Sequence, residues 1–169
     1  MKDQTCCFTG PHHIPASAYN ALDQRLEAKI ETLIHQGVRY FGTGGAMGFD
    51  TMAAFAVLRP RMIYPHVRLI LVLPCKNQTR GWDRTNKKIY NQIRRQADKV
   101  VYFSKQYAPG CMQEHNQHLV DHSAICICYL TNPKSGTAYT VRYAKQHGLR
   151  VINLAAACCD CQMQIDGNS

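Results

Sequence analysis

The stretch V-R-L-I-L-V-L, residues 67–73, decides the fold class of this chain. Only Arg68 within it is polar, and every other residue is Val, Leu or Ile. A strand that is apolar on both of its sides is typical of a parallel sheet covered by helices on both faces, whereas a half-exposed strand alternates apolar and polar residues. Residues 67–73 therefore predict a central strand of an α/β fold.

Strands and helices alternate outward from this segment in both directions. A helix is expected from about Phe49 to Leu58, ended by Pro60, and another over residues 83–97. Further strands are expected at residues 4–9, from Val38, and at 99–104, 124–130 and 149–154, and further helices from a Ser17 cap to about Gln36 and over 111–121 and 137–147. This order predicts a Rossmann-like three-layer domain with a mostly parallel sheet of about six strands.

Length and composition agree with one globular domain. The chain has 169 residues, of which 46% are hydrophobic and 18% charged. We expect residues 1–155 to form the domain and residues 156–169 a loosely ordered, Cys-rich tail. No apolar run approaches the ~20 residues of a membrane span, and the first residues do not resemble a secretion signal. The expected location is the cytoplasm, with no membrane partner.

Neither the cysteines nor the histidines predict a metal site. The nine cysteines are odd in number and irregularly spaced, which argues against a disulfide framework. The tail sequence C-C-D-C, residues 158–161, crowds three thiols together without the second ligand pair that zinc normally takes. His115, His118 and His122 recur at helical spacing, and we interpret them as part of a polar surface.

The positive charge is concentrated in one segment. The formal net charge is +9, yet residues 1–58 are close to neutral, whereas residues 76–99 hold eight basic and two acidic residues. Such a segment attracts phosphate, either on a small ligand or on nucleic acid, and it is equally compatible with a solvated helix face. On the expected helix 83–97 we predict that Arg84, Lys88 and Arg95 are exposed.

The sequence G-T-G-G-A-M-G-F-D, residues 42–50, is the strongest candidate for a ligand-binding loop. Gly44, Gly45 and Gly48 would let backbone N–H groups approach a phosphate at the start of the next helix. The spacing G-x-G-G-x-x-G differs from the dinucleotide fingerprint G-x-G-x-x-G, and a tight turn is the alternative explanation. Asp50 would either stabilise the helix start or contact a ribose hydroxyl.

Two further loops are expected at the same edge of the sheet. Thr9 and Gly10 end the first strand, and Ser135, Gly136 and Thr137 precede or open a helix. Because the carboxyl ends of parallel strands meet at one edge, these loops and residues 42–50 predict a shared anion-binding crevice. Four residues after strand 67–73 would add phosphate, amide and stacking contacts to a base, with packing as the alternative for the last: Lys76, Asn77, Gln78 and Trp82.

Several motifs in this order resemble one protein family. They are C-C-F-T-G, G-G-A-x-G-F-D-T-x-A-A, L-P-C-K-N-Q-T-x-x-W, A-D-K-V-V-Y and G-T-A-Y-T-V-R-Y-A. Together they are similar to the YpsA-type (DUF1273) group of the SLOG superfamily, which includes LOG-type nucleotide phosphoribohydrolases and the Rossmann domain of the DNA-processing protein DprA. The resemblance implies a nucleotide-type ligand over Gly44, Gly45, Gly48 and the Ser135–Thr137 turn.

The sequence departs from the enzymatic LOG pattern P-G-G-x-G-T-x-x-E. The segment Pro133–Thr137 is shorter, and Thr140 occupies the glutamate position. A threonine cannot supply the carboxylate that stabilises an oxocarbenium-like transition state. In the first loop, residues 11–13 read P-H-H where relatives often have G-H-R-P, so an arginine that would hold phosphate is missing.

Three functions follow from these patterns. The leading hypothesis is a sensor or regulatory protein that binds a nucleotide or nucleotide-derived ligand, with NAD and ADP-ribose types included among the candidate cofactors. The alternatives are a nucleotide-processing hydrolase of the phosphoribohydrolase kind and a DprA-type nucleic-acid-binding protein that uses residues 76–99. Catalysis is left open, and a homodimer is a further candidate assembly.

Overall fold

The computed structural model describes residues 1–156 and contains one sheet of parallel strands in the order β4-β3-β2-β1-β5-β6. The strands are β1 (Thr5–Thr9), β2 (Tyr40–Thr43), β3 (Arg68–Cys75), β4 (Lys99–Ser104), β5 (Ile125–Cys128) and β6 (Arg150–Asn153). The helices are α1 (Ala16–His35), α2 (Phe49–Arg61), α3 (Arg84–Gln96), α4 (Cys111–Asp121) and α5 (Gly136–Gln146), with short 3-10 turns at Lys2–Gln4 and Leu154–Ala156. The predicted α/β class is confirmed.

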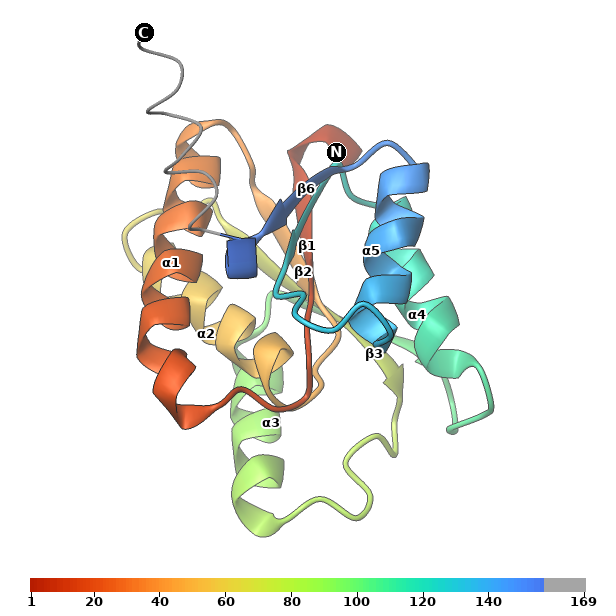
Figure 1. Cartoon of the computed structure of the whole chain (residues 1–169). Coiled ribbons are helices and arrows are strands. Elements are labelled where there is room, and N and C mark those ends of the chain that lie inside the picture. The colour runs from red at the N-terminus through yellow and green to blue at the C-terminus, as the bar shows by residue number, and fades with distance from the viewer. Residues whose placement is uncertain (157–169) are drawn as a thin grey trace, which may run out of the picture.

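Helices cover both faces of the sheet. Helices α1, α2 and α3 lie together on one face, and α4 and α5 lie on the other (Figure 1). Strand β3 contributes to both layers, since Leu69, Leu71 and Leu73 join the core under α1 and α2 while Val72 packs in the cluster with Leu119 of α4. The unbroken apolar run at residues 67–73 thus reflects burial on both sides, as predicted.

The strand order contains one topological switch point. From β1 the chain adds β2, β3 and β4 in one direction, and it then crosses through α4 to place β5 on the other side of β1. All carboxyl ends of the strands lie at one edge, which faces downward in Figure 1. In sheets of this kind, ligands bind at that edge next to the switch point, here between β1 and β5.

Two predicted helix boundaries were wrong. Helix α1 is capped by Pro15 rather than Ser17, and the Ala18 N–H donates to the Pro15 carbonyl, which places Ser17 inside the first turn. Helix α2 continues through Pro60 to Arg61. A proline in the last turn removes only its own N–H, and its carbonyl still accepts from Ile63 and Tyr64.

Of the predicted tail, residues 156–169, the structure describes only Ala156. Residues 157–169, including the C-C-D-C sequence, lie outside the described residues. Over residues 1–156, no helix combines the length and the apolar character needed to cross a membrane.

Reversal of charge on the basic face of α3 should leave the fold almost unchanged. Arg84, Lys88 and Arg95 are exposed, as predicted, and none of them forms an ion pair with another described residue. Exposed charges contribute only about 0–1 kcal/mol each to stability. The triple variant Arg84→Glu, Lys88→Glu, Arg95→Glu should therefore melt within a few degrees of the wild type by circular dichroism. Unfolding of this variant would mean that the face packs against something.

Candidate nucleotide-binding site

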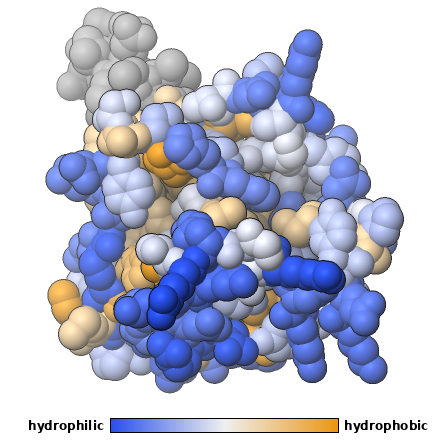
Figure 2. All heavy atoms as spheres, turned by 90° about the horizontal axis from the view of Figure 1, so that it is seen from below, coloured by the Kyte–Doolittle hydropathy of each residue, from blue (hydrophilic) through white to orange (hydrophobic). Residues whose placement is uncertain are grey.

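A cavity of about 570 Å³ opens at the switch point. We call it the switch-point cavity. The structure brings six of the predicted site residues to its wall: Thr9, Gly10, Asp50, Ser135, Gly136 and Thr137. The edge of the molecule that carries it has a largely hydrophilic surface (Figure 2). The predicted meeting of the first loop with the loop before α5 is thus present in the fold.

The start of α5 forms the part of this wall that is best suited to an anion. Ser135 caps the helix, since its Oγ accepts from the Ala138 N–H at 3.2 Å and donates to the Asn132 carbonyl at 2.7 Å. Gly136 is the first helical residue, and a Cβ built on it meets nothing within 4 Å. The first turn of a helix carries N–H groups without helical partners and a partial positive charge, so this end of the cavity favours an anion.

The glycines of residues 42–50 face other parts of the protein. Of these nine residues, Ala46, Met47 and Asp50 line the switch-point cavity or a second cavity beside it, whereas Gly44, Gly45 and Gly48 line neither of the two. A Cβ on Gly45 would overlap Leu73 in the core, and one on Gly44 would overlap the ring of His115. These glycines let the loop approach other parts of the protein closely, and the positive φ of Gly45 and Gly48 fits the tight-turn alternative. Their approach to a phosphate stays a prediction.

Asp50 lies in the first turn of α2 and faces the switch-point cavity. Its Oδ2 accepts from the Ala46 N–H at 3.2 Å, and the neighbouring Thr51 hydroxyl donates to the Ala46 carbonyl at 3.0 Å. Burial raises the pKa of Asp50 to about 7, against the opposing effects of the Ala46 amide and the Thr43 hydroxyl. The side chain therefore braces the loop and also presents a titratable carboxyl group to the cavity.

His115 is buried and does not belong to a polar surface. It lies in one stripe with Cys111 and Leu119, at steps of four residues, and this stripe faces the sheet. Its Nε2–H donates to the Val72 carbonyl, and burial lowers its pKa. His122 is exposed, and its ring centroid lies 4.2 Å from that of His118, with the two rings tilted by 36°. Within residues 1–156 no three His, Cys, Asp or Glu side chains form a metal-binding group.

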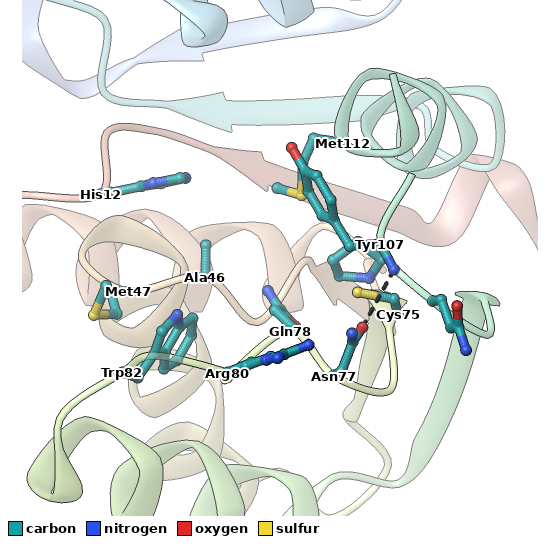
Figure 3. Close-up of a pocket in the computed structure, with 12 residues that line it drawn as sticks. His12, Ala46, Met47, Cys75, Asn77, Gln78, Arg80, Trp82, Tyr107 and Met112 are labelled. Carbon is teal, nitrogen blue, oxygen red and sulfur yellow. Dashed lines mark hydrogen bonds between the residues drawn. The ribbon is translucent and has the colours of Figure 1, made fainter. Parts of the chain in front are cut away.

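A second cavity of about 680 Å³ adjoins the first one. We call it the Trp82 cavity (Figure 3). Its wall comes mainly from the loops after β3 and β4, and Gln78 and Trp82 line it as predicted, together with Asn77, Arg80 and Tyr107. The two cavities share three residues: His12, Ala46 and Met112. One ligand can therefore extend from one cavity into the other.

Hydrogen bonds and ring contacts hold the wall of the Trp82 cavity in place. The Tyr107 N–H donates to Asn77 Oδ1 at 3.2 Å, and Gln78 Nε2 donates to the Gly44 carbonyl at 3.4 Å. The Trp82 ring meets Tyr90 edge to face, with centroids 5.6 Å apart, so Trp82 both packs and lines the cavity. Lys76 points elsewhere, with its Nζ 5.6 Å from the Tyr102 ring centroid.

Comparison with known protein families identifies relatives of this chain. The model of the YpsA family, described as the YspA SLOG family, matches residues 13–155. This chain belongs to that family. Among its relatives, the SPbeta prophage-derived protein YoqJ of Bacillus subtilis is 30% identical over 138 residues, which cover 74% of this chain and 81% of YoqJ. A UPF0398 protein of Halalkalibacterium halodurans is 27% identical over 128 residues, which cover 74% and 68% of the two chains.

Two solved structures share the fold of this YpsA-family chain. DNA processing protein A of Streptococcus pneumoniae matches with a TM-score of 0.64 at 15% identity, over 99% of this chain and 58% of that one. DNA processing protein A of Helicobacter pylori, described for its single-stranded DNA binding mode, matches with a TM-score of 0.62 at 18% identity, over 87% and 63%. The YpsA-family chain thus spans about three-fifths of each structure.

Sequence reasoning missed several residues of this YpsA-family site. Tyr107 and Met112 follow β4, a strand whose loop was not considered although its carboxyl end lies at the same edge. The predicted order of strands and helices is enough to place that loop at the same edge, because β4 was predicted to be a parallel strand. The hydrogen bond from Tyr107 to Asn77 could not be predicted from the sequence, because it depends on how the loops after β3 and β4 fold toward each other.

Proposed function

We propose that the switch-point cavity binds a nucleotide or nucleotide-derived ligand, with a phosphate at the start of α5. The observation that carries this proposal is the open space above Gly136, at a helix N-terminus beside the topological switch. Backbone N–H groups and the helix dipole favour phosphate there, and the Ser135 and Thr137 hydroxyls add donors. Membership of the SLOG family and the single-stranded DNA binding named for one structural relative support a nucleotide or nucleic-acid ligand.

A sensor or regulatory role fits the cavity better than hydrolysis. Thr140 lines the cavity at the position of the LOG glutamate, and its hydroxyl donates to the Gly136 carbonyl at 3.2 Å. Asp50 is the one carboxylate among the lining residues within the described chain. We therefore expect binding of nucleotides, and of NAD or ADP-ribose types, without release of base or phosphate; measurable turnover would favour the hydrolase instead.

The variant Gly136→Leu tests the proposed site. A Cβ at this position meets no other atom within 4 Å, and Gly136 lines the cavity, so we expect a leucine to occupy part of the cavity while the fold persists. We expect the ligand-induced rise in melting temperature, measured over a panel of nucleotides, NAD and ADP-ribose, to disappear in this variant. A loss of affinity of at least about tenfold is expected, since a bulky side chain displaces the phosphate from its N–H donors.

Ala16→Leu is the matched control for this experiment. Ala16 is the exposed first residue of α1 and lines neither cavity, so the same side chain is added at another helix start. The control variant should bind as the wild type does. Equal binding by Gly136→Leu and the wild type would place the ligand elsewhere.

Nucleic acid is the second candidate ligand because of the basic loop and helix beside the Trp82 cavity. Arg80 lines this cavity, and the exposed face of α3 carries Arg84 and Lys88 nearby in sequence. If oligonucleotides bind there, affinity should fall steeply with salt, and the charge-reversed α3 variant should lose it. A small nucleotide held at α5 would be insensitive to the α3 substitutions.

A further inference from the structure

The two adjoining cavities offer different chemistry along one path. The switch-point cavity presents the Ser135 and Thr137 hydroxyls at a helix N-terminus, which suits an anionic group. The Trp82 cavity presents an indole ring and the amide of Asn77, which suit the face and the polar edge of an aromatic heterocycle (Figure 3). Arg80 also lines the Trp82 cavity, so it is the indole ring, together with the helix N-terminus at the other end, that favours one direction for a ligand with an anionic end and a heterocyclic end.

Asp50 lies at the junction between the two cavities. Ala46 lines both of them, and its N–H holds Asp50 Oδ2 at 3.2 Å. Apart from Ala46, only the Thr43 hydroxyl acts on this carboxyl within the described chain, so acceptor positions are left for a ligand. Above pH 7 the ionised form predominates, and an ionised carboxylate only accepts hydrogen bonds and repels phosphate. The part of the ligand at the junction should therefore carry hydroxyl donors.

From this arrangement, and resting on the proposed function, we infer that the ligand is a ribonucleotide. Its phosphate lies at the start of α5, its ribose hydroxyls lie on Asp50 and its base lies beside Trp82. Asp50 is then the residue that determines specificity for ribose. A 2′-deoxyribonucleotide lacks one of the two hydroxyl donors, so a single DNA strand is a poor ligand for this junction.

Binding to the wild-type protein tests the inference without any substitution. Calorimetry first identifies which of AMP, GMP, CMP and UMP binds most tightly. That nucleotide is then compared with its 2′-deoxy form and with ribose 5-phosphate. We expect the ribonucleotide to bind about tenfold more tightly than each of these two compounds. The 2′-deoxy form lacks a hydrogen bond to a charged acceptor, and ribose 5-phosphate lacks the stacked base.

Two variants assign these losses to particular residues. In Asp50→Asn the amide oxygen accepts from Ala46 and the NH₂ group faces the junction, so the preference for ribose over deoxyribose should fall to about twofold or less. Trp82→Ala should weaken the nucleotide about tenfold and leave ribose 5-phosphate unchanged. Tyr19→Ala, which removes an exposed aromatic ring from α1 outside both cavities, should change neither.

The outcomes separate this inference from the proposed function. Equal affinity of the wild type for the ribo and deoxy forms overturns the inference and leaves nucleotide binding intact. An equal loss of affinity for the nucleotide and for ribose 5-phosphate in Trp82→Ala also overturns the inference, because the base would then lie elsewhere. Failure of every probe to bind the wild type overturns the inference. If NAD and ADP-ribose also leave its melting temperature unchanged, the proposed function is overturned as well.

Discussion

We expect Gly45→Val to destabilise the fold by more than about 3 kcal/mol, and this is the largest effect among the substitutions considered. Gly45 has φ +73°, a left-handed conformation that a β-branched residue rarely adopts. A Cβ at this position would also overlap Leu73, which is fully buried in the core. Strain and steric overlap therefore add, and urea unfolding should show a strongly lowered midpoint or no folded protein.

Gly136→Val is the matched control, because it introduces the same side chain in another loop of the same edge. Gly136 has a negative φ and open space around its Cβ position, so this variant should unfold within about 1 kcal/mol of the wild type. Similar stability of the two variants would show that residues 42–50 can move away from β3. Both variants replace a glycine by a valine. A difference in their stability therefore reports on the backbone conformation of each glycine and on its distance from the core.

The two glycines also show what the sequence can predict and what it cannot. Both belong to loops that follow strands, and the alternation around residues 67–73 correctly predicted that these loops meet at one edge. The direction in which a side chain at each of these glycines would point could not be predicted from the sequence. It depends on the left-handed turn at Gly45 and on the approach of Leu73 from β3, and neither is encoded in the spacing of the glycines.

Helix α4 shows the same limit for side-chain burial. The spacing of its three histidines allows one shared face, but the stripe Cys111, His115 and Leu119 decides which residue turns inward. That stripe becomes visible only when α4 is known to pack against β3. Periodicity predicted the helix itself, and tertiary packing determined the burial of His115.

Asp50→Asn should stabilise the unliganded protein at neutral and alkaline pH. The pKa of Asp50 is about 7 in the folded protein, against an ordinary value of 3.8 for an aspartate side chain, because burial disfavours the carboxylate. Between these two values the folded state holds a proton that the unfolded state releases. The free energy of unfolding contributed by Asp50 therefore falls as the pH rises from about 4 to 7, and it stays low above that range.

Asparagine removes this titration while its amide oxygen still accepts from the Ala46 N–H. The gain in unfolding free energy over the wild type should be close to zero at pH 4 and should reach about 2–4 kcal/mol at pH 8. For a chain of this size, the melting temperature at pH 8 should rise by roughly 5–15 °C. Melting curves of both proteins across this pH range measure the difference directly.

His115 is the second buried titratable group near Gly44, and it approaches the same side of this glycine as Asp50 does. Burial lowers the pKa of His115, so its contribution to stability is lost as the pH falls and has the opposite sign from that of Asp50. Both proteins retain His115, so the part of its effect that does not depend on the charge of Asp50 cancels in the difference between them. A difference that is constant from pH 4 to pH 8 would show that Asp50 is ionised throughout this range. Such a carboxylate would be solvated from the switch-point cavity, and bracing of Ala46 would be its main structural role.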